Sequence, residues 1–241
     1  MTNSVLHLAS DRGHADHGWL NAHHTFSFAG YHNPEVMNFG VLRVLNDDVV
    51  AGGRGFGMHP HDNMEIITIP LEGDLQHKDS MGNTAVINHG KVQVMSAGTG
   101  VYHSEMNNNA DKPVKLLQIW MFPNKRDVTP RYDEVALNAT DRHNQFQQVL
   151  SPSSEDAGVW VHQNAWFSIG KFEQDFATEY TVKSDKNGVY AFLISGKAEI
   201  NGQILNQRDG FGVWNTEALS FKALEPETEV LLMDVPMEIS F

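Results

Sequence analysis

The feature that most restricts the fold of this chain is a succession of short apolar runs, rich in Val, Ile, Phe and Tyr, separated by turn-forming residues roughly every ten positions. Helical periodicity is scarce between these runs. Examples are the runs over residues 39–45, 65–71, 91–95, 114–122, 189–194 and 230–235. The pattern predicts an all-β protein of many short antiparallel strands, arranged as a sandwich or barrel of the jelly-roll type.

Polar residues mark the expected turns between these strands. Asn46-Asp47-Asp48 and Met81-Gly82-Asn83 each have the composition of a turn. Asn201-Gly202 predicts a two-residue hairpin, because both residues tolerate positive φ. The strand over residues 39–45 is therefore expected to end at the first of these turns.

Two stretches of the chain resemble each other. Residues 69–76 (IPLEGDLQ) and 193–199 (LISGKAE) each contain an apolar run that turns at a glycine, and Gly90 and Gly210 recur at nearly the same offset. Such repetition predicts a duplicated unit. We expect a first domain over residues 1–135 and a second over 136–241, with the boundary in the polar stretch 124–148 or in 151–158.

Two short pairs of side chains carry the chemistry. His59 and His61 are spaced i, i+2, as are His103 and Glu105, so each pair lies on one face of an extended strand. Three imidazoles and a carboxylate suit first-row divalent metals and leave coordination positions open for substrate or dioxygen. The second half has no histidine after His162, so we expect the metal in the first half and a bracing role for the second.

Composition excludes several other functions. Thirty acidic and 17 basic residues give a net charge of −13, with the basic residues scattered singly, which disfavours direct binding of nucleic acid. The chain contains no cysteine, and its first residues lack the basic start and apolar run of a signal peptide. No apolar run is long enough to span a bilayer. We therefore expect a cytoplasmic protein without a membrane segment.

Several motifs carry a family resemblance. Residues 53–65 (GRGFGMHPHDNME) look like the first cupin motif, and residues 90–107 are similar to the second, although Ser96 replaces the usual proline and His103 comes two positions late. These departures are shared with the pirin family. Residues 95–105 (MSAGTGVYHSE), 12–20 (RGHADHGWL), 24–28 (HTFSF), 118–120 (QIW) and 129–132 (TPRY) resemble that family.

The resemblance implies a bicupin, with two antiparallel barrels in tandem and one metal, usually iron, in the first barrel. Manganese, nickel, copper and zinc are also compatible with the ligands matched by His59, His61, His103 and Glu105. Some pirin-like bacterial proteins are described as quercetin 2,3-dioxygenases. The resemblance thus implies a flavonol and O2 as substrates, with Glu105 as the base that takes the flavonol 3-hydroxyl proton.

Glu65 competes with Glu105 for the carboxylate role, since the glutamate of the first cupin motif is the ligand in ordinary cupins. We prefer Glu105 because its i+2 relation to His103 aims both side chains the same way, and we interpret Glu65 as a carboxylate hydrogen-bonded to a ligand imidazole. His14 and His17 also have a ligand-like spacing, but we expect them to fix the N-terminal segment by hydrogen bonds.

Large aromatic side chains are expected mainly in the core, with one or two of them lining the pocket, where a flat flavonoid would stack. They are Trp19, Phe26, Phe28 and Trp120.

Two other functions stay open at this point. Pirins are also associated with regulation, so the metal could be a redox-sensing element of a protein that binds another protein. A purely structural metal is the third possibility, although the ligand set leaves the coordination shell open. A monomer is expected, because a bicupin already packs two barrels together.

Overall fold

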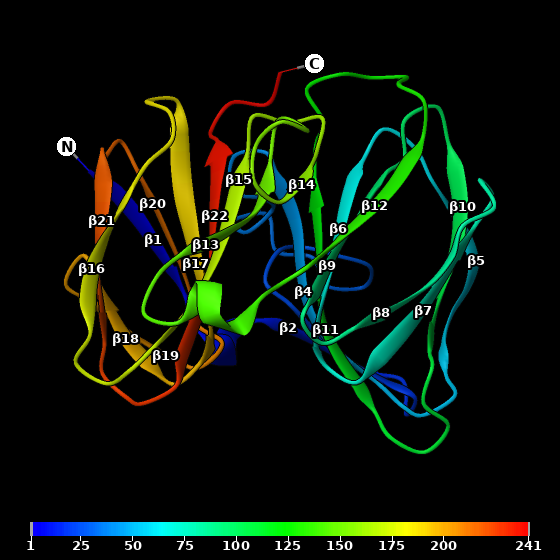
Figure 1. The fold of residues 1–241 in the computed structure, drawn as a ribbon, viewed down its shortest axis with the longest axis horizontal. Helices are drawn as coiled ribbons and strands as arrows, with labels where there is room; N and C mark the ends of the chain where they lie inside the picture. Colours follow the sequence, from blue (N-terminus) through cyan, green and yellow to red (C-terminus); the bar gives the residue numbers. More distant parts are fainter. Residues whose placement is uncertain (1, 241) are drawn as a thin grey trace.

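The computed structural model describes residues 2–240 as an all-β molecule in which two barrels lie side by side (Figure 1). Each barrel combines a seven-stranded sheet with a four-stranded sheet. The described residues contain two short 3-10 helices, η1 (Ala9–Asp11) and η2 (Ala139–Arg142), and no α-helix. The all-β fold predicted from the short apolar runs is therefore confirmed.

The first barrel has its strands in the following spatial order. Its large sheet contains β12 (Arg131–Ala136), β9 (Lys91–Ser96), β6 (Glu65–Glu72), β11 (Val114–Met121), β4 (Leu42–Val50), β3 (Leu20–His24) and β2 (Gly13–Asp16). Its small sheet contains β5 (Gly55–His61), β10 (Val101–Asn107), β7 (Asp74–Asp79) and β8 (Thr84–Asn88).

The second barrel repeats this arrangement. Its large sheet contains β1 (Asn3–His7), β20 (Gly210–Trp214), β17 (Asn187–Ser195), β22 (Thr228–Pro236), β15 (Trp166–Phe172), β13 (Gln147–Ser151) and β14 (Val159–Trp160). Its small sheet contains β16 (Ala177–Thr181), β21 (Ala218–Ala223), β18 (Lys197–Ile200) and β19 (Gln203–Asn206). Apart from the β13–β14 pair, neighbouring strands are antiparallel.

Strand order supports the duplication inferred from the sequence. The consecutive strands β9, β6, β11 and β4 of the first barrel have β20, β17, β22 and β15 as counterparts in the second. Gly73, between β6 and β7, and Gly196, between β17 and β18, both have φ near 78°. A positive φ is strained for other residues, which explains why a glycine recurs at this turn. Gly90 and Gly210 are not equivalent, because Gly210 opens β20 and the preceding turn has Arg208 at φ 71°.

The strand nearest the N-terminus belongs to the second barrel. β1 pairs with β20, from Asn3 opposite Trp214 to His7 opposite Gly210, and so occupies the edge that β12 occupies in the first barrel. Figure 1 shows this strand among the strands of the C-terminal half. The division of the chain between residues 135 and 136 stays a prediction. β1 lies before this boundary in sequence but belongs to the second barrel in space.

Two of the three predicted turns are confirmed and one is wrong. Asn201 and Gly202 join β18 to β19 with φ of 48° and 80°, and residues 81–83 join β7 to β8, as predicted. The turn predicted at Asn46-Asp47-Asp48 is wrong, because these residues lie in the middle of β4. β4 runs from Leu42 to Val50, later than the predicted run 39–45.

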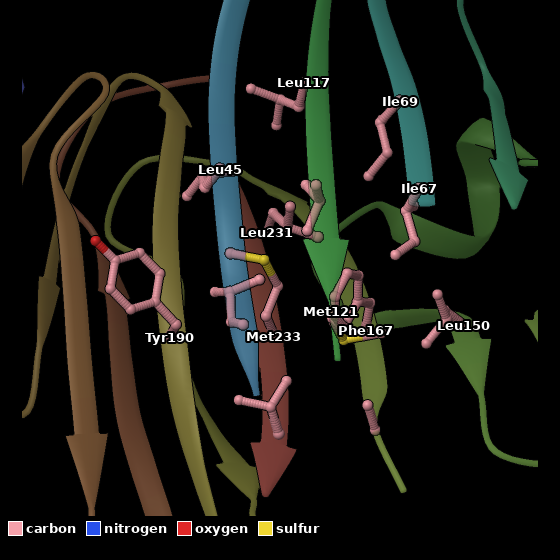
Figure 2. Close-up of a cluster of buried hydrophobic side chains, with 14 of the residues drawn as sticks. Leu45, Ile67, Ile69, Leu117, Met121, Leu150, Phe167, Tyr190, Leu231 and Met233 are labelled. Carbon is pink, nitrogen blue, oxygen red and sulfur yellow. The ribbon is translucent and has the colours of Figure 1, made fainter. Parts of the chain in front are cut away.

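The main hydrophobic core lies between the two large sheets. Every second residue of β6, β11 and β4 points toward the second barrel, as Ile67, Ile69 and Leu117 show, and meets side chains of β15, β17 and β22 such as Phe167 and Met233 (Figure 2). The alternate residues of the same strands face the interior of the first barrel, following the two-residue period of a strand. The core therefore fixes which side chains can line a site inside that barrel.

The interior of the second barrel is filled by its own apolar core. Its buried members include Val189, Ala191, Leu193, Val230 and Leu232, and the rings of Phe172 and Phe221 meet at a tilt with 4.5 Å between their centroids. This packing supports the bracing role predicted for the second half, since the strands that would correspond to the metal-binding pairs carry no histidine.

Removing an aromatic ring from the core between the barrels should destabilise the fold strongly. Phe167 on β15 is fully buried opposite Met233 of β22. We expect Phe167→Ala to lower the free energy of unfolding by about 3–5 kcal/mol, because apolar burial is lost and a cavity remains. Guanidinium chloride denaturation of the metal-free proteins measures this change. Ile204→Ala, at a side chain that is 47% exposed on β19, is the control; an equal effect of the two changes would contradict the packing described here.

Candidate metal centre

Three imidazoles converge inside the first barrel. His59 and His61 project from β5, and His103 projects from β10 directly opposite His59 in the register of the two strands. Their nearest nitrogen atoms lie within 4.8 Å of one another, and their ring centroids are 4.4–4.9 Å apart. A β-bulge in β5 next to this pair shifts the register between His103 and Glu105. The geometry suits one metal ion held by three nitrogen ligands.

The protonation of these histidines favours metal binding. Burial, followed by the neighbouring histidines, lowers the pKa of His61 to about 4 and that of His103 to about 3. Both imidazoles are therefore neutral at physiological pH and offer a lone pair. His59 Nδ1 lies 2.8 Å from the carbonyl oxygen of Gly57, so Nδ1 donates and Nε2 is the free nitrogen.

His103 shows most clearly that the site fits a metal. It is 1% exposed, and neither of its ring nitrogens has a hydrogen-bond partner among the described residues. A buried polar atom without a partner is costly, so such atoms normally have a ligand. A metal ion would supply the missing partner to one of the two nitrogens.

Glu105 faces the same cavity and is held by two side chains. Gln118 Nε2 donates to its Oε2 at 2.8 Å, and the Thr68 hydroxyl oxygen lies 3.1 Å from its Oε1. Its carboxylate is 3% exposed and lines the cavity together with His59 and His61. The tight cluster of possible ligand atoms contains the three histidines without Glu105, so the ligand role of Glu105 stays a prediction.

A row of polar side chains crosses the large sheet beneath the histidines. His24, Asn46, Gln118, Thr68 and Gln93 are successive cross-strand partners on β3, β4, β11, β6 and β9, so they share the inward face. His24 Nδ1 lies 2.8 Å from Asn46 Oδ1. Apolar clusters lie on either side of the row, around Leu116 and around Met95. The metal site therefore has a polar floor between two apolar ends.

A partly open cavity of about 280 Å³ is lined both by His59 and His61 and by residues of this row. Phe28, Phe56 and Trp120 line it, and Trp120 stands edge-on to His61 at 4.8 Å between ring centroids. Phe26 lies in the core between the barrels. Two of the four aromatic residues considered from the sequence, Phe28 and Trp120, thus line the cavity.

Asn46 and Asp48 are cavity residues that the sequence did not reveal. Both line the cavity from β4, but the sequence Asn-Asp-Asp has the composition of a turn, which concealed them. The strand tolerates three polar residues because each of their side chains reaches a polar partner or the cavity. Asn46 binds His24, Asp48 faces the cavity, and Asp47 points the other way to Arg12 and Arg208 at 3.1 and 3.2 Å.

Glu65 lies away from the histidines, where the two halves of the chain meet. Ser96 Oγ donates to its Oε2 at 2.7 Å, and the backbone N–H of His162 donates to the same carboxylate. Neither contact is the hydrogen bond to a ligand imidazole that we expected. Arg131 lies near it and packs on Trp160 at 3.9 Å from the ring centroid. Glu65 therefore helps to join the barrels.

The stability contributed by Glu65 should depend on pH. Burial raises its pKa from 4.5 to about 7, so its folded-state stabilisation is complete below pH 4.5 and is lost as the pH rises through 7. We expect wild type to lose about 3 kcal/mol relative to Glu65→Gln between pH 4.5 and pH 8, since each pKa unit corresponds to about 1.4 kcal/mol. Unfolding free energies of both proteins at the two pH values test this; a constant difference would contradict it.

The N-terminal histidines are outside the cluster. His14 stacks on His23 with 4.6 Å between ring centroids, and His14 and His17 line a second cavity of about 690 Å³. This outer cavity shares Leu20, Ala22, His24, Phe28 and Phe56 with the inner one. The two cavities are therefore neighbours.

Fold and site together define a bicupin, with one candidate metal centre among the described residues, placed in the first barrel. Residues 5–121 match the family model described as Pirin, and residues 148–235 match the model of a quercetinase C-terminal cupin domain. The chain belongs to the pirin family, as its motifs indicated.

Known relatives cover nearly the whole chain. A quercetin 2,3-dioxygenase of Escherichia coli K12 is 42% identical over 231 residues, which is 96% of this chain and 98% of the relative. The crystal structure of YhhW from Escherichia coli has a TM-score of 0.93 at 40% identity, covering 99% of this chain and 100% of that one. The structure of the bacterial pirin YhhW in complex with nickel(II) has a TM-score of 0.92 at 40% identity, with coverage of 98% and 100%.

Within residues 2–240, no helix has the length and apolar character that crossing a bilayer requires.

Proposed function

We propose that this protein is a metal-dependent dioxygenase that cleaves a flavonol such as quercetin with O2. The observation that carries the proposal is the histidine triad, two of whose members, His59 and His61, line a cavity walled by aromatic and apolar side chains. Such a cavity suits a flat, largely apolar ligand with a few oxygen atoms. The 42% identity to a quercetin 2,3-dioxygenase supports the same substrate class.

The metal proposed here is one divalent first-row ion, with iron as the first choice. His59, His61 and His103 would hold it through nitrogen, and Glu105 would be the fourth ligand through oxygen. Manganese, nickel, copper and zinc suit the same donors, and the relative in complex with nickel(II) supports a first-row divalent metal. When bound, the metal supplies Lewis-acid activation and a template for the flavonol oxygens.

Glu105 is the residue we assign to proton transfer. Its carboxylate would accept the proton of the flavonol 3-hydroxyl, which makes the ring electron-rich and open to attack by O2 at C2. Thr68 and Gln118 hold this carboxylate in place from the polar floor of the cavity.

The surrounding side chains would exclude water and orient the substrate. Phe28 and Trp120 meet edge-to-face with ring centroids 5.3 Å apart, and both line the cavity. A flavonol ring system would pack against them. Exclusion of water protects the deprotonated substrate from regaining a proton before it reacts with O2.

Turnover of quercetin by the metal-loaded protein tests the proposed function. Protein loaded separately with Fe(II), Mn(II), Ni(II) or Cu(II) should bleach the near-visible absorption of quercetin with a matching uptake of O2. Metal-free protein and free metal ions at the same concentrations are the controls, since quercetin also oxidises without an enzyme. Turnover absent with every metal would overturn the proposal and favour the regulatory role.

A further inference from the structure

The middle of β4 presents a carboxyl group to the cavity that the proposed mechanism does not use. Asn46 and Asp48 are two residues apart and both line the cavity, whereas Asp47 between them points to Arg12 and Arg208. This alternation follows from the two-residue period of a strand. Asp48 therefore faces the cavity, and Glu105 is the one other carboxylate among the residues that line it.

Asp48 lacks a protein partner for one of its oxygens. Its side chain is 4% exposed, and Oδ1 has no hydrogen-bond partner among the described residues. Leaving a buried polar atom unpaired costs roughly 1–3 kcal/mol, so native proteins place such atoms where a ligand or a water molecule completes them. Because Asp48 is one of the residues that line the cavity, a bound ligand is the natural partner of its carboxyl group.

The neighbours of Asp48 define the chemistry of this ligand. Leu20, Ala22 and Phe56 surround the polar groups of this wall with apolar surface, which suits the edge of an aromatic ring. Asn46 is already bound to His24, so Asp48 is the group on β4 whose oxygen is free. Burial raises the pKa of Asp48 to about 8, and the nearby Asp47 and Glu105 add to the effect. A carboxyl oxygen accepts a hydrogen bond in either protonation state.

Building on the proposed function, we propose that Asp48 determines substrate specificity by accepting a hydrogen bond from a phenolic hydroxyl of the flavonol other than the 3-hydroxyl. The protein then distinguishes polyhydroxylated flavonols from flavonols that carry only the 3-hydroxyl. A site that hydrogen-bonds a hydroxyl rejects the analogue that lacks it, because its own polar group stays buried without a partner.

Anaerobic binding of two flavonols tests this role separately from turnover. Quercetin and 3-hydroxyflavone share the 3-hydroxyl and the 4-carbonyl, but 3-hydroxyflavone lacks the other hydroxyls. We measure the Kd of each by quenching of tryptophan fluorescence with Ni(II)-loaded protein in the absence of O2. Wild type should prefer quercetin, and Asp48→Leu should reduce this preference about tenfold, the loss expected for one hydrogen bond, with the Kd of 3-hydroxyflavone unchanged.

Three further variants sharpen the test. Asp48→Asn keeps an acceptor oxygen and should retain most of the preference, and Asp48→Ala replaces Asp48→Leu if the larger side chain prevents folding. Asp47→Asn removes a carboxylate from the same strand, but on the opposite face. It should lower thermal stability and leave the preference for quercetin intact.

The outcomes separate this inference from the proposed function. Equal preference in wild type and Asp48→Leu, or an equal loss of affinity for both flavonols, would overturn the role of Asp48 and leave the proposed function standing. Metal-loaded wild type that binds neither flavonol would overturn both. Loss of the preference in Asp47→Asn to the same extent would also overturn the assignment, because that side chain does not face the cavity.

Discussion

Replacing His103 by alanine is expected to remove the metal from the protein. His103 supplies one of only three clustered imidazoles, and it is the most deeply buried of them. Because loss of a mere hydrogen-bond partner of a metal ligand costs 10–100-fold in affinity, loss of the ligand itself should weaken metal binding by more than about 100-fold. Elemental analysis of the isolated protein and calorimetric titration with Ni(II) measure the effect, and turnover of quercetin should disappear with the metal.

His32→Ala is the matched control for this change. His32 is an exposed histidine between β3 and β4 and does not belong to the clustered ligands. We expect its replacement to leave the metal content at the wild-type level. A His103→Ala protein that still binds one equivalent of metal tightly would show that the cluster is not the metal site.

Glu105→Gln is expected to reduce turnover by about 10²–10⁴-fold, the range typical of removing a general base. The amide keeps the size of the side chain, so the cavity keeps its shape while the group that would take the 3-hydroxyl proton is lost. Metal content should also fall, since an amide oxygen is a weaker ligand than a carboxylate. Steady-state kinetics and elemental analysis of the same preparation measure the two effects together.

Glu65→Gln tests the competing assignment. Glu65 binds Ser96 and the backbone of His162, so its replacement should leave metal content and turnover near wild type at a pH where the protein is stable. Loss of metal in Glu65→Gln with retention in Glu105→Gln would reverse the roles that we assign to the two carboxylates.

The sequence predicted the parts of this molecule that depend on local spacing. The pairs containing His59 and His103 lie on two neighbouring strands, and each pair points to one side because successive side chains of a strand alternate between its two faces. The same holds for Asn201-Gly202, whose positive φ values are a property of the two residues. The all-β fold and the pirin family are confirmed for the same reason, since both follow from short motifs.

The parts that the sequence did not predict depend on partners far away in the chain. Asn46 and Asp48 looked like turn residues, and only their contacts across the barrel explain why a strand carries them. Thr68 sits among isoleucines in β6, and its hydrogen bond to Glu105 joins positions that are distant in sequence. Such contacts depend on the register in which the strands pair, and this register cannot be read from a single sequence.

The position of β1 has a consequence for how the two barrels become one unit. The edge of β20 is paired only when residues near the N-terminus reach it, so the second barrel cannot complete its large sheet from the C-terminal half alone. A fragment of residues 136–241 would leave that edge open and prone to self-association. Pairing of segments that are remote in sequence is slow and late in folding. We therefore expect β1 to pair with β20 in the last folding step, and this pairing to hold the two barrels together.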